Sequence, residues 1–228
     1  MAWFPLESNP DVMNKFMQKL GVPDKWNIVD VYGLESEALA WVPKPVLAVI
    51  LLFPYSEKHH NYATEQNERL KVSGQDVSPN VYFLKQVVSN ACGTIALVHS
   101  VANNCDRIEL AEGKFKELLS VSKNMSPEDR GTLLQSVAGQ IMNVHQELAQ
   151  EGQTELNPNE SVNHHFVAFV EKEGNLYELD GRKEFPINHG PSSPETLLED
   201  AAKICKEFMT RDAEDVNFTV LALTAQEA

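Results

Sequence analysis

The chain has 228 residues, and 43% of them are apolar, which is enough to build a hydrophobic core and excludes intrinsic disorder as the main state. Its 19 basic and 33 acidic residues give a formal net charge of −14, which opposes binding to nucleic-acid phosphates or anionic lipid and favours a basic partner. The longest apolar run, Val46–Phe53, is shorter than the roughly 18 residues that cross a bilayer, and the N-terminus lacks a signal-peptide pattern. We expect a soluble, cytoplasmic, monomeric protein of one sizeable domain or two small ones.

The three cysteines, Cys92, Cys105 and Cys205, form an odd and sparse set without a C-x-x-C pair. This pattern suggests neither a disulfide framework nor a structural zinc site, and it fits a reduced setting. The histidines do not have metal-ligand spacing either. We therefore expect no metal site.

The first half of the chain predicts a helix, a strand and two more helices. Asn9-Pro10 caps an apolar-periodic segment that ends at Gly21, which predicts a first helix. The run Val46–Phe53, bounded by two prolines and rich in β-branched residues, predicts a strand that is buried on both faces and central in a sheet. Helical spacing then recurs from Cys92 to Asn103, with Asn90 as a possible cap. It recurs again towards Gln150 after 126–129 (SPED), a capping-box-like pattern that begins at Ser126.

The last third of the chain predicts strands. Aromatic and β-branched residues fill three segments, with a helix from about Pro194 to Thr210 before the last of them: His165–Val170, Leu176–Asp180 and Val216–Leu223. Helices first and strands later favour an α+β fold in which a mostly antiparallel sheet lies between helices.

The segment Gln86–Thr94 places Cys92 at the start of a predicted helix, behind a polar loop. Unpaired N–H groups and the positive end of the helix dipole lower a thiol pKa from about 8.5 towards roughly 3.5 to 7.5, which produces a nucleophilic thiolate. Gln86 can donate its amide hydrogens to the oxyanion of an acyl intermediate, beside the Cys92 backbone N–H. The alternative is a buried structural cysteine, which is the commoner role of a cysteine at a helix start.

A nucleophilic cysteine needs a base, and His165 with Asp180 can supply one. If a four-residue loop, 171–174, joins the two strands, His165 lies directly opposite Asp180, close enough for the carboxylate to accept the Nδ1 hydrogen and fix the tautomer. His164 then points to the other face of the strand. The alternative is an ordinary strand-end histidine followed by an Asp-Gly turn.

The other candidate groups are assigned to structure rather than chemistry. We expect His99 in the core or close behind the site, and His59 and His60 in solvent. Cys105 is expected at a helix end, and Cys205 at a core position of the late helix.

The order of these motifs resembles the ubiquitin C-terminal hydrolase (UCH) family of thiol peptidases, in particular its short single-domain members. The residues that carry the resemblance are Gln86, 90–94 (NACGT), 165–166 (HF), 176–182 (LYELDGR) and 185–190 (FPINHG), with 5–7 (PLE) and 30–34 (DVYGL). Because the likeness covers essentially the whole chain, it implies a single catalytic domain over residues 1–228. It also implies a papain-like core with a knotted backbone, which general rules count as rare.

The resemblance assigns roles to four residues: Cys92 as nucleophile, His165 as general base and acid, Asp180 as the group that orients His165, and Gln86 as oxyanion donor. It implies ubiquitin as the partner, with NEDD8 as a second candidate, and no cofactor. Because the C-terminal tail of ubiquitin is basic, the substrate contacts are expected near the N-terminus, at Leu6, Glu7, Asp11 and Asp30. The alternative for the acids is an ordinary solvated surface.

The segment 151–162 joins a long helix to the strand of His165 and exceeds the median connection of about 4–6 residues. Its loop signals and end residues are Glu151, Gly152, Asn157, Pro158, Asn159 and Val162. The resemblance implies that it crosses the active site and admits only small or unfolded leaving groups. Two other functions stay open from the sequence: a ubiquitin-binding protein with low turnover, and a papain-like hydrolase of another small substrate.

Overall fold

The structure, a computed structural model, describes residues 3, 5–136, 163–214 and 216–226. Its helices are α1 (Pro10–Lys19), α2 (Ser36–Leu39), α3 (Glu57–Ser73), α4 (Cys92–Ala102), α5 (Lys114–Ser122), α6 (Pro127–Ser136) and α8 (Leu197–Arg211). Its strands are β1 (Trp26–Asp30), β2 (Val46–Pro54), β3 (His164–Lys172), β4 (Asn175–Leu179), β5 (Ile187–Pro191) and β6 (Thr219–Ala225). Among the described residues, no helix is both long and apolar enough to cross a membrane.

The strands form one antiparallel sheet in the order β1-β6-β2-β3-β4-β5. The prediction that Val46–Phe53 is a central strand is confirmed, because β2 pairs with β6 on one side and β3 on the other. Its unbroken apolar run has a physical reason: alternate residues face different core clusters, so both faces are buried.

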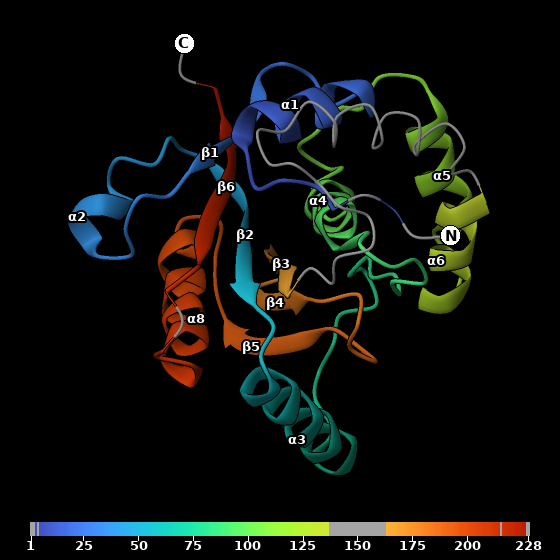
Figure 1. Ribbon diagram of the computed structural model, residues 1–228. Coiled ribbons are helices and arrows are strands. Elements are labelled where there is room, and N and C mark those ends of the chain that lie inside the picture. Colours follow the sequence, from blue (N-terminus) through green and yellow to red (C-terminus); the bar gives the residue numbers. More distant parts are fainter. Residues whose placement is uncertain (1–2, 4, 137–162, 215, 227–228) are drawn as a thin grey trace.

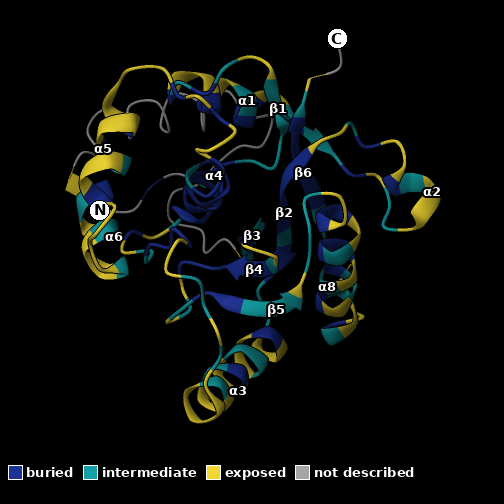
Figure 2. Ribbon diagram, turned by 180° about the vertical axis from the view of Figure 1, so that it is seen from behind, coloured by how far each residue is buried: buried dark blue, intermediate teal, exposed yellow. Residues whose placement is uncertain are grey.

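Helices cover both faces of this sheet, which confirms the α+β prediction (Figure 1). The helix α4 packs on β2 and β3 from one side, and α8 packs on β2, β3 and β4 from the other. Figure 2 shows that the sheet and α4 are largely buried, whereas α3 is mostly exposed. The knotted path stays a prediction, because residues 137–162 lie outside the described part of the chain, as does the rest of the helix expected to reach Gln150.

Two of the predicted helix caps are present and one is not. The side chain of Asn9 accepts a hydrogen bond from the Asp11 N–H at 2.9 Å, with Pro10 in the first turn of α1. The Ser126 hydroxyl accepts from the Asp129 N–H at 3.1 Å, ahead of α6. Asn90 does not cap α4, because its backbone is left-handed, with φ of 62°, and the capping position belongs to Ala91.

The prediction of helices first and strands later is wrong in its order, because β1 and β2 precede most of the helices. The sequence-based prediction also missed β1, β5, α2, α3 and α5. The helix α3 has a physical reason to be missed: His59 and Gln66 are its buried residues, so it has no apolar stripe. The expectation that His59 is solvated is also wrong, since its Nε2 lies 3.1 Å from the Phe208 carbonyl in the protein interior.

Candidate active site

Cys92 is the first residue of α4, the helix whose residues from Cys92 to Val101 are all buried. The loop ahead of it is held by the N-terminal segment, where the Trp3 N–H donates to the Ser89 carbonyl at 3.0 Å. Gly93 allows close packing at this point: a Cβ there would lie 2.9 Å from the Leu6 Cβ and 3.3 Å from the Phe166 ring. The predicted placement of the thiol at a helix N-terminus is therefore confirmed.

The β3–β4 hairpin carries the predicted base and its carboxylate, in a register different from the one expected. The ladder runs from Ala168–Leu179 to Lys172–Asn175, so the turn is two residues, Glu173-Gly174. Both have positive φ, 50° and 81°, as a tight type I′ hairpin turn requires. The expected four-residue loop is wrong by two residues. Side chains alternate with a period of two, so this shift keeps His165 and Asp180 on one face as diagonal neighbours.

His165 is fully buried, and its Nε2 lies 2.7 Å from Asp180 Oδ1. The expected contact through Nδ1 is therefore wrong. With Nε2 bound to the carboxylate, Nδ1 is the ring nitrogen left for the thiol, and it makes no well-formed hydrogen bond among the described residues. Such contacts commonly tighten only in the substrate complex. His164, by contrast, is partly exposed, which agrees with its predicted place on the other face.

The electrostatics favour a thiolate beside a protonated imidazole. Burial raises the pKa of Cys92, but the nearby His165 imidazole, the Phe166 backbone and the Arg182 charge together outweigh burial, so the net shift is downward. Burial lowers the pKa of His165, but the Asp180 carboxylate raises it to about 9. Burial likewise raises the pKa of Asp180, but His165, the Lys183 charge and the Arg182 N–H together lower it further than burial raises it. All three shifts therefore favour the state in which the thiolate, the imidazolium and the carboxylate are charged together.

The three cysteines all lie within the described residues, and their surroundings shift the thiol pKa in different directions. Burial raises the pKa of Cys105, with a further rise from Asp106. Burial raises the pKa of Cys205 far more, because that thiol is completely enclosed under the sheet. Cys92 is the one whose pKa falls, so it is the thiol suited to nucleophilic attack.

Gln86 lies ahead of α4, and its backbone N–H donates to the Gly181 carbonyl at 2.9 Å. Its side-chain Nε2 donates to the Val88 carbonyl at 3.0 Å, which fixes the orientation of the amide. An amide nitrogen carries two hydrogens, so one remains for an oxyanion. Gly181 directly follows Asp180, and the Gln86 segment therefore contacts the turn that carries the carboxylate.

Aromatic side chains enclose the base, and sequence reasoning did not find them. The rings of Phe53 and Tyr55 meet His165 edge-on, with centroids 5.8 and 5.5 Å away. The Arg182 guanidinium lies 4.9 Å above the Tyr55 ring, and its charge helps to lower the pKa of Cys92. The sequence feature that could have predicted these two contacts is the position of both rings at the end of β2, opposite the start of β3. Phe53 pairs with His165 in the ladder.

His99 is confirmed as a core histidine behind the site. It is fully buried, its ring stacks on Phe83, and its Nε2 accepts a hydrogen bond from the Leu84 N–H at 3.1 Å. Burial lowers its pKa to about 4, so the ring is neutral and helps to hold the segment that leads to Gln86.

The residues expected to meet the substrate tail differ in exposure. Asp11 is exposed in the first turn of α1, Glu7 and Asp30 are partly exposed, and Leu6 is buried against Gly93. The side chain of Asn14 joins α1 to β1 by bonding both the N–H and the carbonyl of Ile28, at 2.6 and 3.0 Å. This joint places α1 and the end of β1 beside each other, as a shared acidic surface requires.

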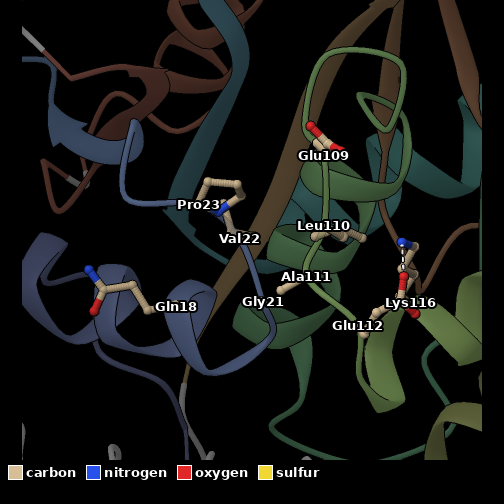
Figure 3. Close-up of a pocket in the computed structure, with 9 residues that line it drawn as sticks. All are labelled: Gln18, Gly21, Val22, Pro23, Glu109, Leu110, Ala111, Glu112 and Lys116. Carbon is tan, nitrogen blue, oxygen red and sulfur yellow. Dashed lines mark hydrogen bonds and ion pairs between the residues drawn. The ribbon is translucent and has the colours of Figure 1, made fainter.

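The predicted crossover segment, with Glu151, Gly152, Asn157, Pro158, Asn159 and Val162, lies outside the described residues. A separate hollow of about 470 Å³ lies between the end of α1 and the start of α5 (Figure 3). Its lining residues are Gln18, Gly21, Val22, Pro23, Glu109, Leu110, Ala111, Glu112 and Lys116. None of the four candidate catalytic residues is among them, so this hollow is not the active site.

A buried Cys–His–Asp set, with its thiol at a helix N-terminus against an antiparallel sheet, defines a hydrolase of the cysteine peptidase class. Comparison with known families agrees: the family described as "Ubiquitin carboxyl-terminal hydrolase, family 1" matches residues 3–210. The chain therefore belongs to this family.

Known relatives are similar over their whole length. A ubiquitin carboxyl-terminal hydrolase of Drosophila melanogaster is 50% identical over 227 residues, which cover 100% of this chain and 99% of the relative. The human ubiquitin carboxyl-terminal hydrolase isozyme L1 is 48% identical over 220 residues, or 96% of each chain. Among solved structures, the UCH37 catalytic domain of Trichinella spiralis, bound to ubiquitin vinyl methyl ester, matches with a TM-score of 0.76 at 25% identity, covering 99% of this chain and 97% of that one.

Proposed function

We propose that this chain hydrolyses esters, thioesters or amides at the C-terminal glycine of ubiquitin, through an acyl-enzyme on Cys92. The observation that carries the proposal is the 2.7 Å hydrogen bond between buried His165 and Asp180, beside a thiol whose pKa is lowered. Family membership and a relative solved with a ubiquitin derivative support ubiquitin as the substrate.

In the proposed reaction the Cys92 thiolate attacks the glycine carbonyl, and the carbonyl electrons form an oxyanion. The Cys92 backbone N–H and Gln86 Nε2 stabilise that oxyanion. The His165 imidazolium then donates its proton to the leaving nitrogen, oxygen or sulfur as the bond to the carbonyl carbon breaks. In the second half the neutral imidazole takes a proton from water, and the hydroxide attacks the thioester. The carbon–sulfur bond breaks to restore the Cys92 thiolate, and the carboxylic acid that forms loses its proton to solvent. Asp180 holds the ring in place throughout.

The acids Glu7, Asp11 and Asp30 are proposed to attract the arginines of the ubiquitin tail. The net charge of −14 and the joint between α1 and β1 support this assignment. NEDD8 as an alternative substrate, a monomeric state and a cytoplasmic location stay predictions.

The experiment is release of a fluorophore from a ubiquitin C-terminal amide, with the matched NEDD8 amide alongside. We expect turnover by the unmodified protein and none by Cys92→Ala, which should still bind ubiquitin, because the sulfur adds little to the contact area. Cys105→Ala and Cys205→Ala are the matched controls and should stay active. Labelling by a ubiquitin probe with a C-terminal electrophile should map to Cys92; an adduct at Cys105 or Cys205 would overturn the assignment. Tight binding without turnover would instead support the buffering alternative.

For the segment 151–162, we propose a limit on leaving-group size. Inserting about ten Gly/Ser residues near Asn159 costs no more than about 1 kcal/mol of loop entropy. The insertion should admit folded ubiquitin fusions while small adducts are cleaved at the starting rate. Equal cleavage of folded fusions and small adducts by the unmodified protein would refute the limit.

A further inference from the structure

The carboxylate of Asp180 lies on a short turn, residues 180–183, that directly follows β4. The Lys183 N–H donates to the Asp180 carbonyl at 3.0 Å and closes the turn. The Arg182 N–H donates to Asp180 Oδ1 at 2.9 Å, the same oxygen that binds His165. The direction in which Asp180 points is therefore set by the geometry of this turn.

The turn is anchored by the Lys183 side chain, which folds back into the protein. Its Nζ donates to Glu178 Oε1 at 2.5 Å and to Gln66 Oε1 of α3 at 2.7 Å. Glu178 is 1% exposed, and its other oxygen accepts a hydrogen bond from His189 Nε2 of β5 at 2.8 Å. One ammonium group thus joins the turn to β4, α3 and, through Glu178, β5.

Burying either member of the Lys183–Glu178 ion pair without the other would cost a large free energy. A buried carboxylate costs several kcal/mol when it lacks a partner, and Glu178 lies two residues from a second buried carboxylate, Asp180. Burial raises the pKa of Glu178, but the Lys183 charge and His189 hold it well below its usual range. The charge of Lys183 also helps to lower the pKa of Asp180. The ammonium therefore balances both carboxylates.

The opposite side of the same turn contacts the segment of Gln86, the candidate oxyanion donor. The Gln86 N–H donates to the Gly181 carbonyl at 2.9 Å, and Lys85 Nζ donates to the Lys183 carbonyl at 2.5 Å. A Cβ on Gly181 would lie 3.0 Å from the Gln86 nitrogen, so the two segments are in direct contact. A shift of the turn would therefore move Asp180 and Gln86 together.

We propose that Lys183 is a positioning residue for catalysis: held by Glu178 and Gln66, it fixes the turn that aims Asp180 at His165 and that supports Gln86. The inference rests on the proposed function, because it needs the catalytic roles of Asp180 and Gln86. Lys183 acts through these two residues and not on the substrate.

The charge of Lys183 also acts on the ionised site, so the pH dependence of the reaction reports on it. The titratable and charged groups around the turn are Glu178, Asp180, Arg182, Glu184, His165 of β3, His189 of β5, Cys92 of α4, His59 and Tyr62 of α3, Cys205 and Arg211 of α8, Lys85 ahead of α4 and Tyr55 after β2. Removing the ammonium makes this group more negative and disfavours the thiolate. Removing the Glu178 charge does the opposite.

The test measures kcat, KM and the pH profile of kcat/KM with the ubiquitin amide, together with Tm. Lys183→Met keeps the length of the side chain and should lower kcat about tenfold or more, with KM within about twofold. Its acid limb should move to higher pH by about half a unit or more. Glu178→Gln should also lower kcat, with the acid limb moved to lower pH. The control is Lys71→Met on α3, which removes an exposed 3.0 Å ion pair to Glu184, the residue after Lys183. This variant should leave kcat and the pH profile unchanged.

Each outcome either supports or overturns the proposed role of Lys183. Opposite shifts of the acid limb with a lower kcat in both variants support the proposal. A folded Lys183→Met with the kcat and profile of the unmodified protein overturns it, as does a loss of Tm in both variants without a change in kcat or profile. If Lys183→Met does not fold, Glu178→Gln decides alone: an unchanged kcat and acid limb overturn the proposal. Failure of the proposed function is distinguishable, because the unmodified protein would then release no fluorophore or Cys92→Ala would still release it.

Discussion

Gly131 is a position where the local rule and the tertiary structure predict opposite results. It lies inside α6, where replacing Gly by Ala normally stabilises a helix by about 1 kcal/mol. Here, however, an added Cβ would overlap the carbonyl oxygen of Lys85, and it would lie 3.2 Å from both the Lys85 carbonyl carbon and Val87 Cγ1. Because the obstacle is backbone, it cannot turn away as a flexible side chain can.

The net change in the free energy of unfolding combines the helix-propensity gain with the steric cost of the added Cβ. Overpacking costs about 1–3 kcal/mol, and a backbone obstacle favours the upper end. Subtracting the helix gain leaves a net loss of about 2 kcal/mol, or roughly 4–8 °C in Tm for a chain of this length. Lys85 precedes Gln86, and its N–H donates to the Pro127 carbonyl at 2.9 Å, so the shift reaches the oxyanion donor. We expect Gly131→Ala to lower kcat by about tenfold.

Thermal unfolding and fluorophore release from the ubiquitin amide check both numbers. The matched control is Gly113→Ala, where no atom lies within 4 Å of an added Cβ; its free energy of unfolding should change by less than about 1 kcal/mol. A Gly131→Ala variant with a raised Tm, or with Tm and kcat both unchanged, would show that α6 does not fix the Lys85–Gln86 segment.

Three further predictions concern the ionised groups. Fluorophore release should fall as pH rises through about 9, because the His165 imidazolium is the proposed proton donor. The raised pKa of His165 also stabilises the fold; this stabilisation is complete below pH 6.5 and is lost as pH rises through about 9. A pH series of Tm should therefore show this loss in the unmodified protein and not in His165→Gln. Asp180→Asn should leave a folded protein but slow kcat by orders of magnitude, because an amide can donate to Nε2 and leave the ring proton on Nδ1. His164→Ala should be mild, and the reverse ranking would contradict the observed strand faces. Asp30→Lys should weaken ubiquitin binding and flatten the salt dependence of its association rate in stopped flow, and an unchanged salt slope would return Asp30 to the solvated surface.

Local patterns determined the parts of the site that depend on neighbours in the chain. The thiol at a helix start, the buried central strand and the shared face of His165 and Asp180 follow from periods of 3.6 and 2 residues. The shared face survived an error of two residues in the hairpin register, because an even shift does not change the face of a strand. Which ring nitrogen meets Asp180 depends on the side-chain rotamers in the folded core, and the sequence reading was wrong there.

The tertiary structure alone decided what lies around those residues. Lys183 and Gln66 are 117 positions apart, and no periodicity links a charged turn to a polar helix such as α3. The burial of His59 likewise depends on Phe208, 149 positions later in the chain. A buried ion pair is stable only when partners from several elements meet it, so its members look like ordinary surface residues in the sequence. The chain's own pattern thus determined which groups are candidates for catalysis, and long-range packing decided how they are held.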